Sequence, residues 1–166
     1  LYAIHSSSDW GIGDFGMLGE MAEWVGERGG NILGTLPLDA AFLDNPCEHS
    51  PYSPASRLFW NEIYLNIEDI PELKSCPKAK TIIASKDFQQ EISKLKSAKM
   101  IDYKAVMRSK RTVLQLISDE ITARNLDRSA QIDKSISDYP EVDMYAKFRA
   151  VTEAEGKEWQ NWDSVM

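Results

Sequence analysis

Cysteine and histidine are scarce in this sequence: its 166 residues contain only two of each. Cys47 and Cys76 are too few and too far apart for a disulfide framework, so we interpret them as reduced thiols. His5 and His49 stand alone, so no metal-ligand cluster can be assembled from spacing. No serine or cysteine lies in a recognisable nucleophile elbow with a base. These absences predict no metal site and argue against a covalent hydrolase built from this chain alone.

Positive charge is also in deficit, because 19 Lys and Arg stand against 26 Asp and Glu, for a net charge of -7. Such a chain repels phosphate backbones and anionic lipid, so neither nucleic acid nor a membrane is expected as a partner. No apolar run approaches the roughly 18 residues of a membrane span, and no secretory leader pattern is found. We therefore expect a cytoplasmic protein.

What the sequence does contain is the composition of a globular domain, with 43% hydrophobic and 27% charged residues. That composition allows a single buried core. The chain opens on Leu1 rather than on methionine, and Leu1–Ile4 already has the pattern of a strand. We interpret this start as a sign of excision from a longer protein.

The first 38 residues follow the pattern strand, helix, strand. After the strand at Leu1–Ile4 and a small-residue loop, Asp14 is in position to cap a helix. Apolar residues then recur at helical spacing until Gly29 and Gly30 end the pattern. Asn31–Leu38 is a short apolar run, typical of a strand buried on both faces. The pattern predicts a βαβ unit with parallel strands and a right-handed crossover.

The remainder is expected to consist of a long loop followed by a helical part. Residues 39–58 are proline-rich and aperiodic, which predicts a loop of a length that is usually functional. Glu62–Ile67 alternates and predicts an extended segment. From Ser85 onward, apolar stripes predict amphipathic helices, the last over Met144–Glu155, and the aromatic tail Trp159–Trp162 is expected to pack on the rest. The stripes are formed by Phe88, Ile92 and Leu95, and then by Tyr103, Val106, Val113, Ile117 and Ile121.

The segment Gly11–Gly16 is literally a GxGxxG motif between a strand and a helix, and Asp39 lies where a ribose-binding acid would be expected. A dinucleotide fingerprint begins almost at the end of its strand, however, whereas Ser6–Trp10 intervenes here. Asp14 would also place a carboxylate beside the phosphates at the helix N-terminus. A glycine-bearing turn into a capped helix is the favoured interpretation, and a phosphate-cradling turn is the alternative.

The stretch richest in candidate residues is His49–Arg57, where Pro51 and Pro54 fix the backbone around Tyr52. A tyrosine held at the mouth of a parallel sheet can lay its ring on a sugar and offer its hydroxyl as a hydrogen-bond partner. From these residues alone, a turn with Tyr52 packed down as a plug is the competing interpretation.

Three carboxylates in the same region, those of Asp39, Asp44 and Glu48, could in principle form a glycosidase pair. Retention of configuration requires a nucleophile and an acid/base group about 5 Å apart. Nothing in the spacing singles out such a pair, so we interpret all three as solvated loop charges.

An ordered series of motifs runs through essentially the whole chain. These are Trp10–Gly16, Leu36–Leu38, Ser50–Pro54 with Ser56, Arg57 and Asn61, Asp102–Val106 with Lys110, and Phe148–Ala150 followed by Trp159 and Trp162. The series resembles the bacterial amylomaltases, the 4-α-glucanotransferases of glycoside hydrolase family 77. Its first half is similar to the start of their catalytic barrel, and its second half to their helical insertion.

The resemblance implies an α/β fold in which residues 1–68 supply the first strands, helix and substrate-groove loop of a TIM (β/α)8 barrel. Residues 69–166 would then form a mainly helical insertion subdomain, leaving the barrel incomplete. It also implies retaining transfer of an α-1,4-glucan segment through a covalent glycosyl-enzyme, without any cofactor. The catalytic carboxylates belong to later barrel strands, so none is assigned here. The serine and tyrosine of the SPY motif face the donor sugar in that family, which implies substrate binding by Ser50 and Tyr52.

The expected partners are therefore a maltodextrin or other α-1,4-glucan and the rest of the chain's own barrel. Alone, the chain is expected to be inactive, and to be poorly stable or self-associating because strand edges stay exposed. Two positions depart from the family pattern, since many relatives have Asp at His49 and Pro at Glu62. The alternative is a stand-alone, non-catalytic carbohydrate-binding or scaffolding protein.

Overall fold

The computed structural model describes residues 1, 3–124 and 127–162. The α-helices are α1 (Phe15–Glu27), α2 (Pro77–Ile83), α3 (Lys86–Ser97), α4 (Tyr103–Arg124), α5 (Asp127–Asp138) and α6 (Glu141–Glu155). Short 3-10 helices are η1 (Glu62–Tyr64), η2 (Pro71–Ser75) and η3 (Trp159–Asn161). The strands are β1 (Asp39–Ala40), β2 (Phe42–Leu43), β3 (Cys47–Glu48) and β4 (Ser56–Trp60).

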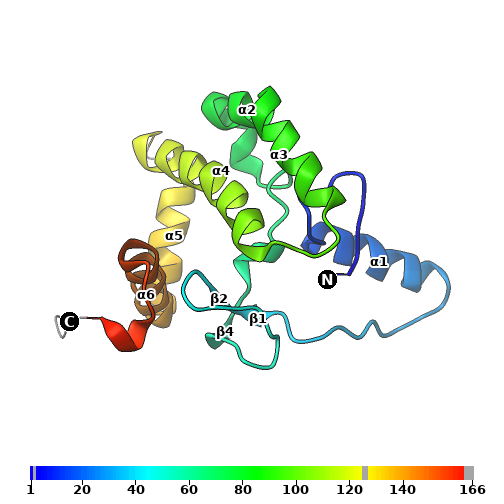
Figure 1. Ribbon diagram of the computed structural model, residues 1–166, viewed down its shortest axis with the longest axis horizontal. Helices are drawn as coiled ribbons and strands as arrows, with labels where there is room; N and C mark the ends of the chain where they lie inside the picture. Colours follow the sequence, from blue (N-terminus) through cyan, green and yellow to red (C-terminus); the bar gives the residue numbers. More distant parts are fainter. Residues whose placement is uncertain (2, 125–126, 163–166) are drawn as a thin grey trace.

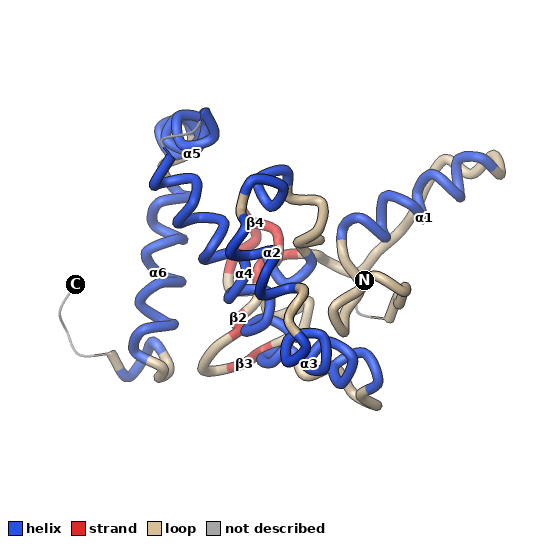
Figure 2. Tube along the Cα trace, turned by 90° about the horizontal axis from the view of Figure 1, so that it is seen from above, coloured by secondary structure: helices blue, strands red, loops and turns tan. Residues whose placement is uncertain are grey.

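Helix α4 lies in the middle of the molecule, and α2, α3 and η1 pack against it (Figure 1). Helix α1 projects from one side, and α6 lies on the opposite side (Figure 2). The core surrounds α4 and draws on both halves of the chain. Its most deeply buried apolar side chains include Ile12, Ile63, Ile67, Val106 and Val113.

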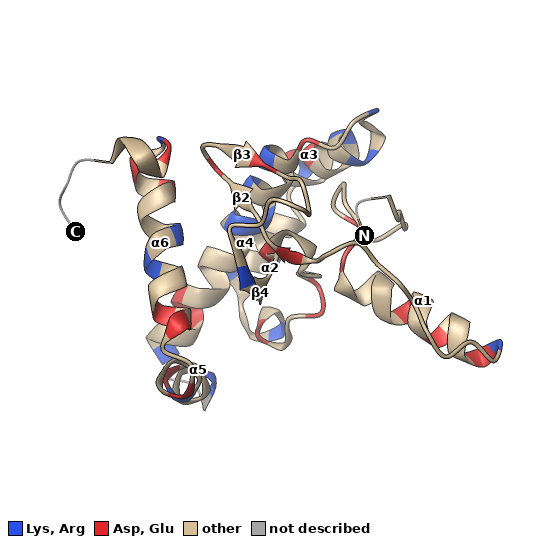
Figure 3. Cartoon of the chain, turned by 90° about the horizontal axis from the view of Figure 1, so that it is seen from below, with Lys and Arg blue, Asp and Glu red and all other residues tan. Residues whose placement is uncertain are grey.

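Helix α1 begins where the sequence predicts. The side chain of Asp14 accepts a hydrogen bond from the Met17 amide at 3.0 Å, which caps the helix. Gly29, with φ of 80°, follows the last turn, as the predicted glycine ending requires. The charges on α1 are all acidic, and its outer half is exposed (Figure 3).

The prediction of two parallel strands is wrong for this structure, and so is the prediction of a βαβ unit built from them. Of the predicted strand Leu1–Ile4, Tyr2 lies outside the described residues, and the Ile4 amide donates to the Leu1 carbonyl at 2.9 Å, a short-range contact typical of a turn. Residues 31–37 have no assigned secondary structure apart from a bend, and Ile32 is 88% exposed. An apolar run forms a buried strand only when neighbouring strands satisfy its amides and carbonyls. In the described part of the chain, no strand offers these segments a partner.

The predicted long loop contains two antiparallel ribbons instead. Strands β2 and β3 pair as a hairpin, with Phe42 opposite Glu48 and Leu43 opposite Cys47. Outside it, β1 pairs with β4, with Asp39 opposite Trp60 and an irregularity before Ala40. Strands of two residues have too little periodicity to detect in a sequence. The nested arrangement leaves residues 49–55 as a short connection between β3 and β4, which we call the β3–β4 loop.

The predicted extended segment Glu62–Ile67 is also wrong, because it starts with the 3-10 helix η1. The Asn61 side chain accepts a hydrogen bond from the Ile63 amide at 3.1 Å and so favours a helical turn. Ile63 and Ile67 are nevertheless buried. The alternation correctly marked two core residues, although not the backbone conformation.

The helical prediction from Ser85 onward is confirmed. Ser85 caps α3 through the Phe88 amide, and the predicted stripes of α3 and α4 belong to the core. Helix α6 begins three residues before the predicted Met144. Helices α2 and α5 were not predicted, because the first has only 7 residues and the second has few apolar ones. In the tail, the Trp162 ring lies 5.7 Å from that of Phe148, so the aromatic end does pack on α6.

The division into residues 1–68 and 69–166 stays a prediction, since side chains from both ranges share the core. No helix within the described ranges is long and apolar enough to cross a membrane.

Candidate functional site

The β3–β4 loop carries the two predicted substrate-binding residues. Ser50 and Ser53 close a turn, with the Ser53 amide donating to the Ser50 carbonyl at 3.1 Å. The Ala55 amide donates to the Ala40 carbonyl at 2.7 Å, so the end of the loop is fixed to β1. Pro51 lies inside the turn and restricts its backbone further. The loop therefore has a defined shape.

Within the turn, Ser50 and Tyr52 are brought together. The Ser50 hydroxyl accepts a hydrogen bond from the Tyr52 amide at 3.3 Å, and the Ser50 amide donates to the Glu48 carboxylate at 2.8 Å. The Tyr52 side chain is 70% exposed, so the plug interpretation is wrong. The arrangement presents an aromatic ring to solvent beside a serine, which suits contact with a sugar face.

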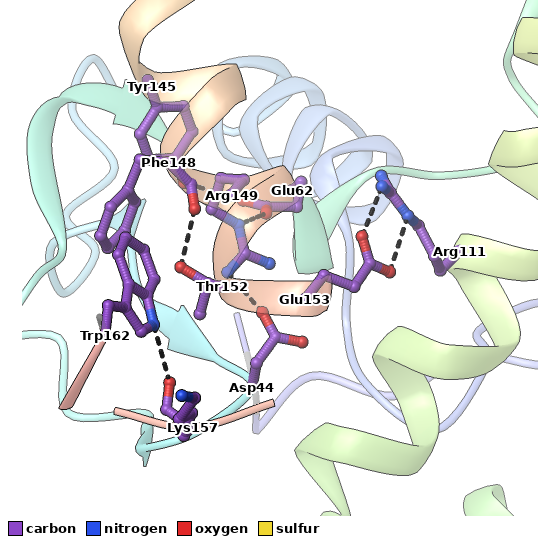
Figure 4. Close-up of polar contacts among 10 residues, drawn as sticks. All are labelled: Asp44, Glu62, Arg111, Tyr145, Phe148, Arg149, Thr152, Glu153, Lys157 and Trp162. Carbon is purple, nitrogen blue, oxygen red and sulfur yellow. Dashed lines mark hydrogen bonds and ion pairs between the residues drawn. The ribbon is translucent and has the colours of Figure 1, made fainter. Parts of the chain in front are cut away.

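A charged cluster lies at the two ends of the segment that bears this loop (Figure 4). On α6, Arg149 donates from Nε to Glu62 at 2.9 Å and from Nη1 to Asp44 at 2.7 Å. Only 15% of its side chain is exposed. Burial alone would lower the pKa of Arg149, but the carboxylates of Glu62 and Asp44 outweigh it and raise the pKa. The interpretation of Asp44 as a solvated loop charge is therefore wrong, because that carboxylate is held by a guanidinium.

Tyr145, one turn before Arg149 on α6, extends the cluster. Its hydroxyl donates to Glu62 at 3.4 Å, and its ring stacks on that of Phe59, with centroids 4.6 Å apart. Burial and then the Glu62 charge raise its pKa. The phenol thus stays protonated and remains a donor to the carboxylate.

An open cleft of about 700 Å³ adjoins the cluster, between α4, α6 and the β2–β3 turn. Arg111 of α4 reaches Glu153 of α6 across it through two hydrogen bonds, at 3.1 and 2.6 Å. The other charged side chains that line the cleft are Asp44, Glu62, Lys104, Arg108 and Arg149. Neither Ser50 nor Tyr52 lines it, so the cleft and the predicted sugar contacts are separate features.

At the GxGxxG turn, the protein's own groups occupy the position that a bound phosphate would need. Asp9 accepts hydrogen bonds from the amides of Ser6 at 2.7 Å and Gly11 at 2.8 Å. A Cβ atom added at Gly13 would lie 2.4 Å from the Leu1 carbonyl oxygen, so this glycine is needed for packing. A phosphate would meet carboxylates and closely packed backbone here, which excludes the nucleotide-binding alternative.

A buried lysine connects α4 to the segment that follows β4. The Lys110 ammonium donates to the carbonyls of Ile63 at 2.6 Å and Leu65 at 2.8 Å. Burial lowers its pKa to about 8, although the charges of Asp14 and Asp9 act in the opposite direction. This residue holds the core together and does not face either the β3–β4 loop or solvent.

Comparison with known proteins identifies the family. The chain belongs to the 4-alpha-glucanotransferase family, glycoside hydrolase family 77, whose model matches residues 1–166. It is 35% identical over 119 residues to the 4-alpha-glucanotransferase of Haemophilus influenzae, covering 72% of this chain and 17% of that protein. It is 31% identical over 175 residues to that of Mycobacterium bovis, covering 98% of this chain and 23% of the relative.

A solved structure shows the same relationship. The crystal structure of amylomaltase from Corynebacterium glutamicum superposes with a TM-score of 0.60 at 29% sequence identity, covering 76% of this chain and 19% of that one. The family and the similarity to an amylomaltase structure, both predicted from motifs, are confirmed. The chain spans about a fifth of the length of the curated relatives named above.

Sequence reasoning missed the contacts of Arg149, Glu62 and Lys110. Arg149 and Lys110 appear in the motifs, but a motif match does not say what a side chain touches. One signal was available: Glu62 directly precedes the apolar Ile63, and an acidic residue beside a buried segment requires a partner. The partner is 87 residues away in sequence, so spacing could not have identified it.

Proposed function

We propose that this chain is part of a 4-α-glucanotransferase that transfers α-1,4-glucan segments between maltodextrins, and that Ser50 and Tyr52 contact the donor sugar. The exposed Tyr52 ring, on a loop fixed at both ends, is the observation that supports this. Family membership supports the reaction class. A cytoplasmic location belongs to the same proposal.

The proposed chemistry is a retaining double displacement. One carboxylate attacks the anomeric carbon while a second protonates the leaving oxygen, and the covalent glycosyl-enzyme is then attacked by the acceptor glucan. No cofactor takes part in these steps. We assign neither carboxylate to this chain, so it should not turn over substrate alone. Its proposed contribution is to bind and orient the donor.

The proposal includes an incomplete barrel. With the remaining barrel strands beside them, residues 31–38 would gain the partners that a parallel strand requires. Two apolar side chains of this segment, Ile32 and Leu36, are exposed, and neighbouring barrel strands would cover them, which supports this proposal.

Incubation with maltotriose tests the activity. The 166-residue chain and the product of its complete reading frame are each incubated with maltotriose, and glucose and longer maltodextrins are measured. We expect products only from the longer protein. Products from the short chain would contradict the assignment of the catalytic carboxylates elsewhere, and no products from either would contradict the transferase proposal.

Non-catalytic carbohydrate binding is the second candidate, and the exposed tyrosine favours it equally. Titration of the 166-residue chain with maltoheptaose, followed by tyrosine chemical shifts, distinguishes the two. Tyr52→Ala should abolish any binding, whereas Tyr139→Ala, which removes a ring of similar exposure, should not. Binding by the longer protein without any transfer would support this second candidate.

A further inference from the structure

The segment from Asp44 to Glu62 begins and ends at the same guanidinium. Arg149 holds the Asp44 carboxylate at 2.7 Å and the Glu62 carboxylate at 2.9 Å (Figure 4). The two acidic side chains are 25% and 23% exposed, so water screens these pairs only in part. Between them lie β3, the β3–β4 loop and β4. One side chain of α6 therefore closes the whole segment that carries Ser50 and Tyr52.

We propose that Arg149 is a positioning residue for the β3–β4 loop, and hence for the sugar contacts of Ser50 and Tyr52. The inference rests on the proposed function, in which that loop contacts the donor glucan. A ligand gains affinity when the loop that it meets is already held in its bound shape. Arg149 does not touch the loop, so it would act only through the ends of the segment.

A second contact joins the same segment to the helices. The His49 ring, at the start of the loop, stacks on the Tyr103 ring at the start of α4, with centroids 4.5 Å apart and planes 16° apart. His49 therefore contacts α4 and Glu62 contacts α6. Both contacts join the loop-bearing segment to the helical part, which supports a positioning role for them.

Removal of the guanidinium would do more than delete two hydrogen bonds. Asp44 and Glu62 would lose the one cation that pairs with both of them, and like charges repel. Tyr145 could still donate to Glu62, and the β1–β4 and β2–β3 pairs would still hold the flanks of the segment. We therefore expect the loop to stay attached but to sample more conformations, because the one side chain that contacts both of its acidic ends is gone.

Hydrogen exchange in the 166-residue chain tests the positioning itself, without reference to any activity. Arg149→Met should increase the exchange rate of amides in residues 48–56 at least fivefold. Arg111→Met is the matched control, because it breaks a bidentate pair with Glu153 on the same cleft but touches neither end of the segment. Equal exchange in both variants and the parent chain would overturn the inference. If Arg149→Met does not fold, Glu62→Gln, which removes the charge at one end only, gives the same test.

Kinetics of the complete protein then separate this inference from the proposed function. Arg149→Met should raise KM for maltotriose about tenfold and change kcat less than twofold, because a loosened loop loses uniform binding. Arg149→Lys, which can hold one carboxylate at a time, should recover part of the loss. An unchanged KM in an active enzyme would refute positioning by Arg149 alone. Absence of activity in the parent protein would refute the proposed function and leave the exchange result to decide the positioning.

Discussion

The ammonium group of Lys110 lies 2.6 Å from the carbonyl oxygen of Ile63, inside the core. This cation has the backbone carbonyls of Ile63 and Leu65 as its hydrogen-bond partners. Its pKa is lowered from 10.5 to about 8, chiefly by burial. The folded state consequently releases a proton more readily at this position than the unfolded state does.

Stability should rise with pH on account of Lys110. Between pH 8 and 10.5 the unfolded chain keeps the proton that the folded chain has lost, so alkaline conditions favour the folded state. The contribution is complete above the unfolded pKa and is lost as pH falls through the folded pKa. Relative to Lys110→Met, we expect the parent chain to gain about 2 to 3 kcal/mol between pH 7.5 and 10. Urea unfolding of both chains at these two pH values measures this gain. The same change in unfolding free energy in both chains would contradict the prediction.

Gly13→Ala should destabilise the chain by about 2 kcal/mol or more, because its Cβ would meet two backbone oxygens that cannot move independently. Gly19→Ala is the matched control inside α1. An added Cβ meets nothing within 4 Å there, and alanine should stabilise the helix by about 0.5 to 1 kcal/mol. Thermal unfolding of the two variants should therefore shift in opposite directions. A shift in the same direction would show that the turn at Gly13 relaxes freely.

Self-association of the 166-residue chain should depend on the unpaired segment 31–38. Ile32 is 88% exposed within it, next to backbone groups that have no ladder partner. Ile32→Lys should reduce the weight-average mass in sedimentation equilibrium. Met100→Lys, which removes an apolar side chain of similar exposure from another loop, should not. Equal association in both variants would assign the contact to a different surface.

The two thiols should react at different rates. Burial raises the pKa of Cys47, so its alkylation at pH 7.5 should be slower than that of a free thiol. Cys76 is fully buried and should react only when the chain unfolds. Mass spectrometry after timed exposure to iodoacetamide measures both rates. Rapid labelling of Cys76 under native conditions would mean that α2 opens independently of the rest.

The helices were predictable and the strands were not, for a physical reason. Asp14 and Ser85 cap their helices through amides three residues away, and the stripe on α4 repeats within one element, so a short window of sequence contains the signal. A strand depends on a partner that the window does not contain. Asn31–Leu38 has the composition of a buried strand but remains unpaired. Strands β2 and β3 did form, although no sequence pattern predicted them.

In the candidate site, too, local features were predictable from the sequence and distant contacts were not. Ser50 and Tyr52 could be singled out because prolines beside them restrict the backbone locally. That Arg149 closes the segment around Tyr52 depends on contacts across 87 and 105 residues. Their roles in sugar binding stay a prediction until glucan binding is measured.

The same separation along the chain sets an order of events during synthesis. Asp44 leaves the ribosome 105 residues before Arg149, which at 5 to 20 residues per second amounts to a delay of about 5 to 20 s. Throughout that interval the two acidic ends have no cation from α6 to share, so the contacts that join both ends of the segment to α6 are among the last of this chain to form.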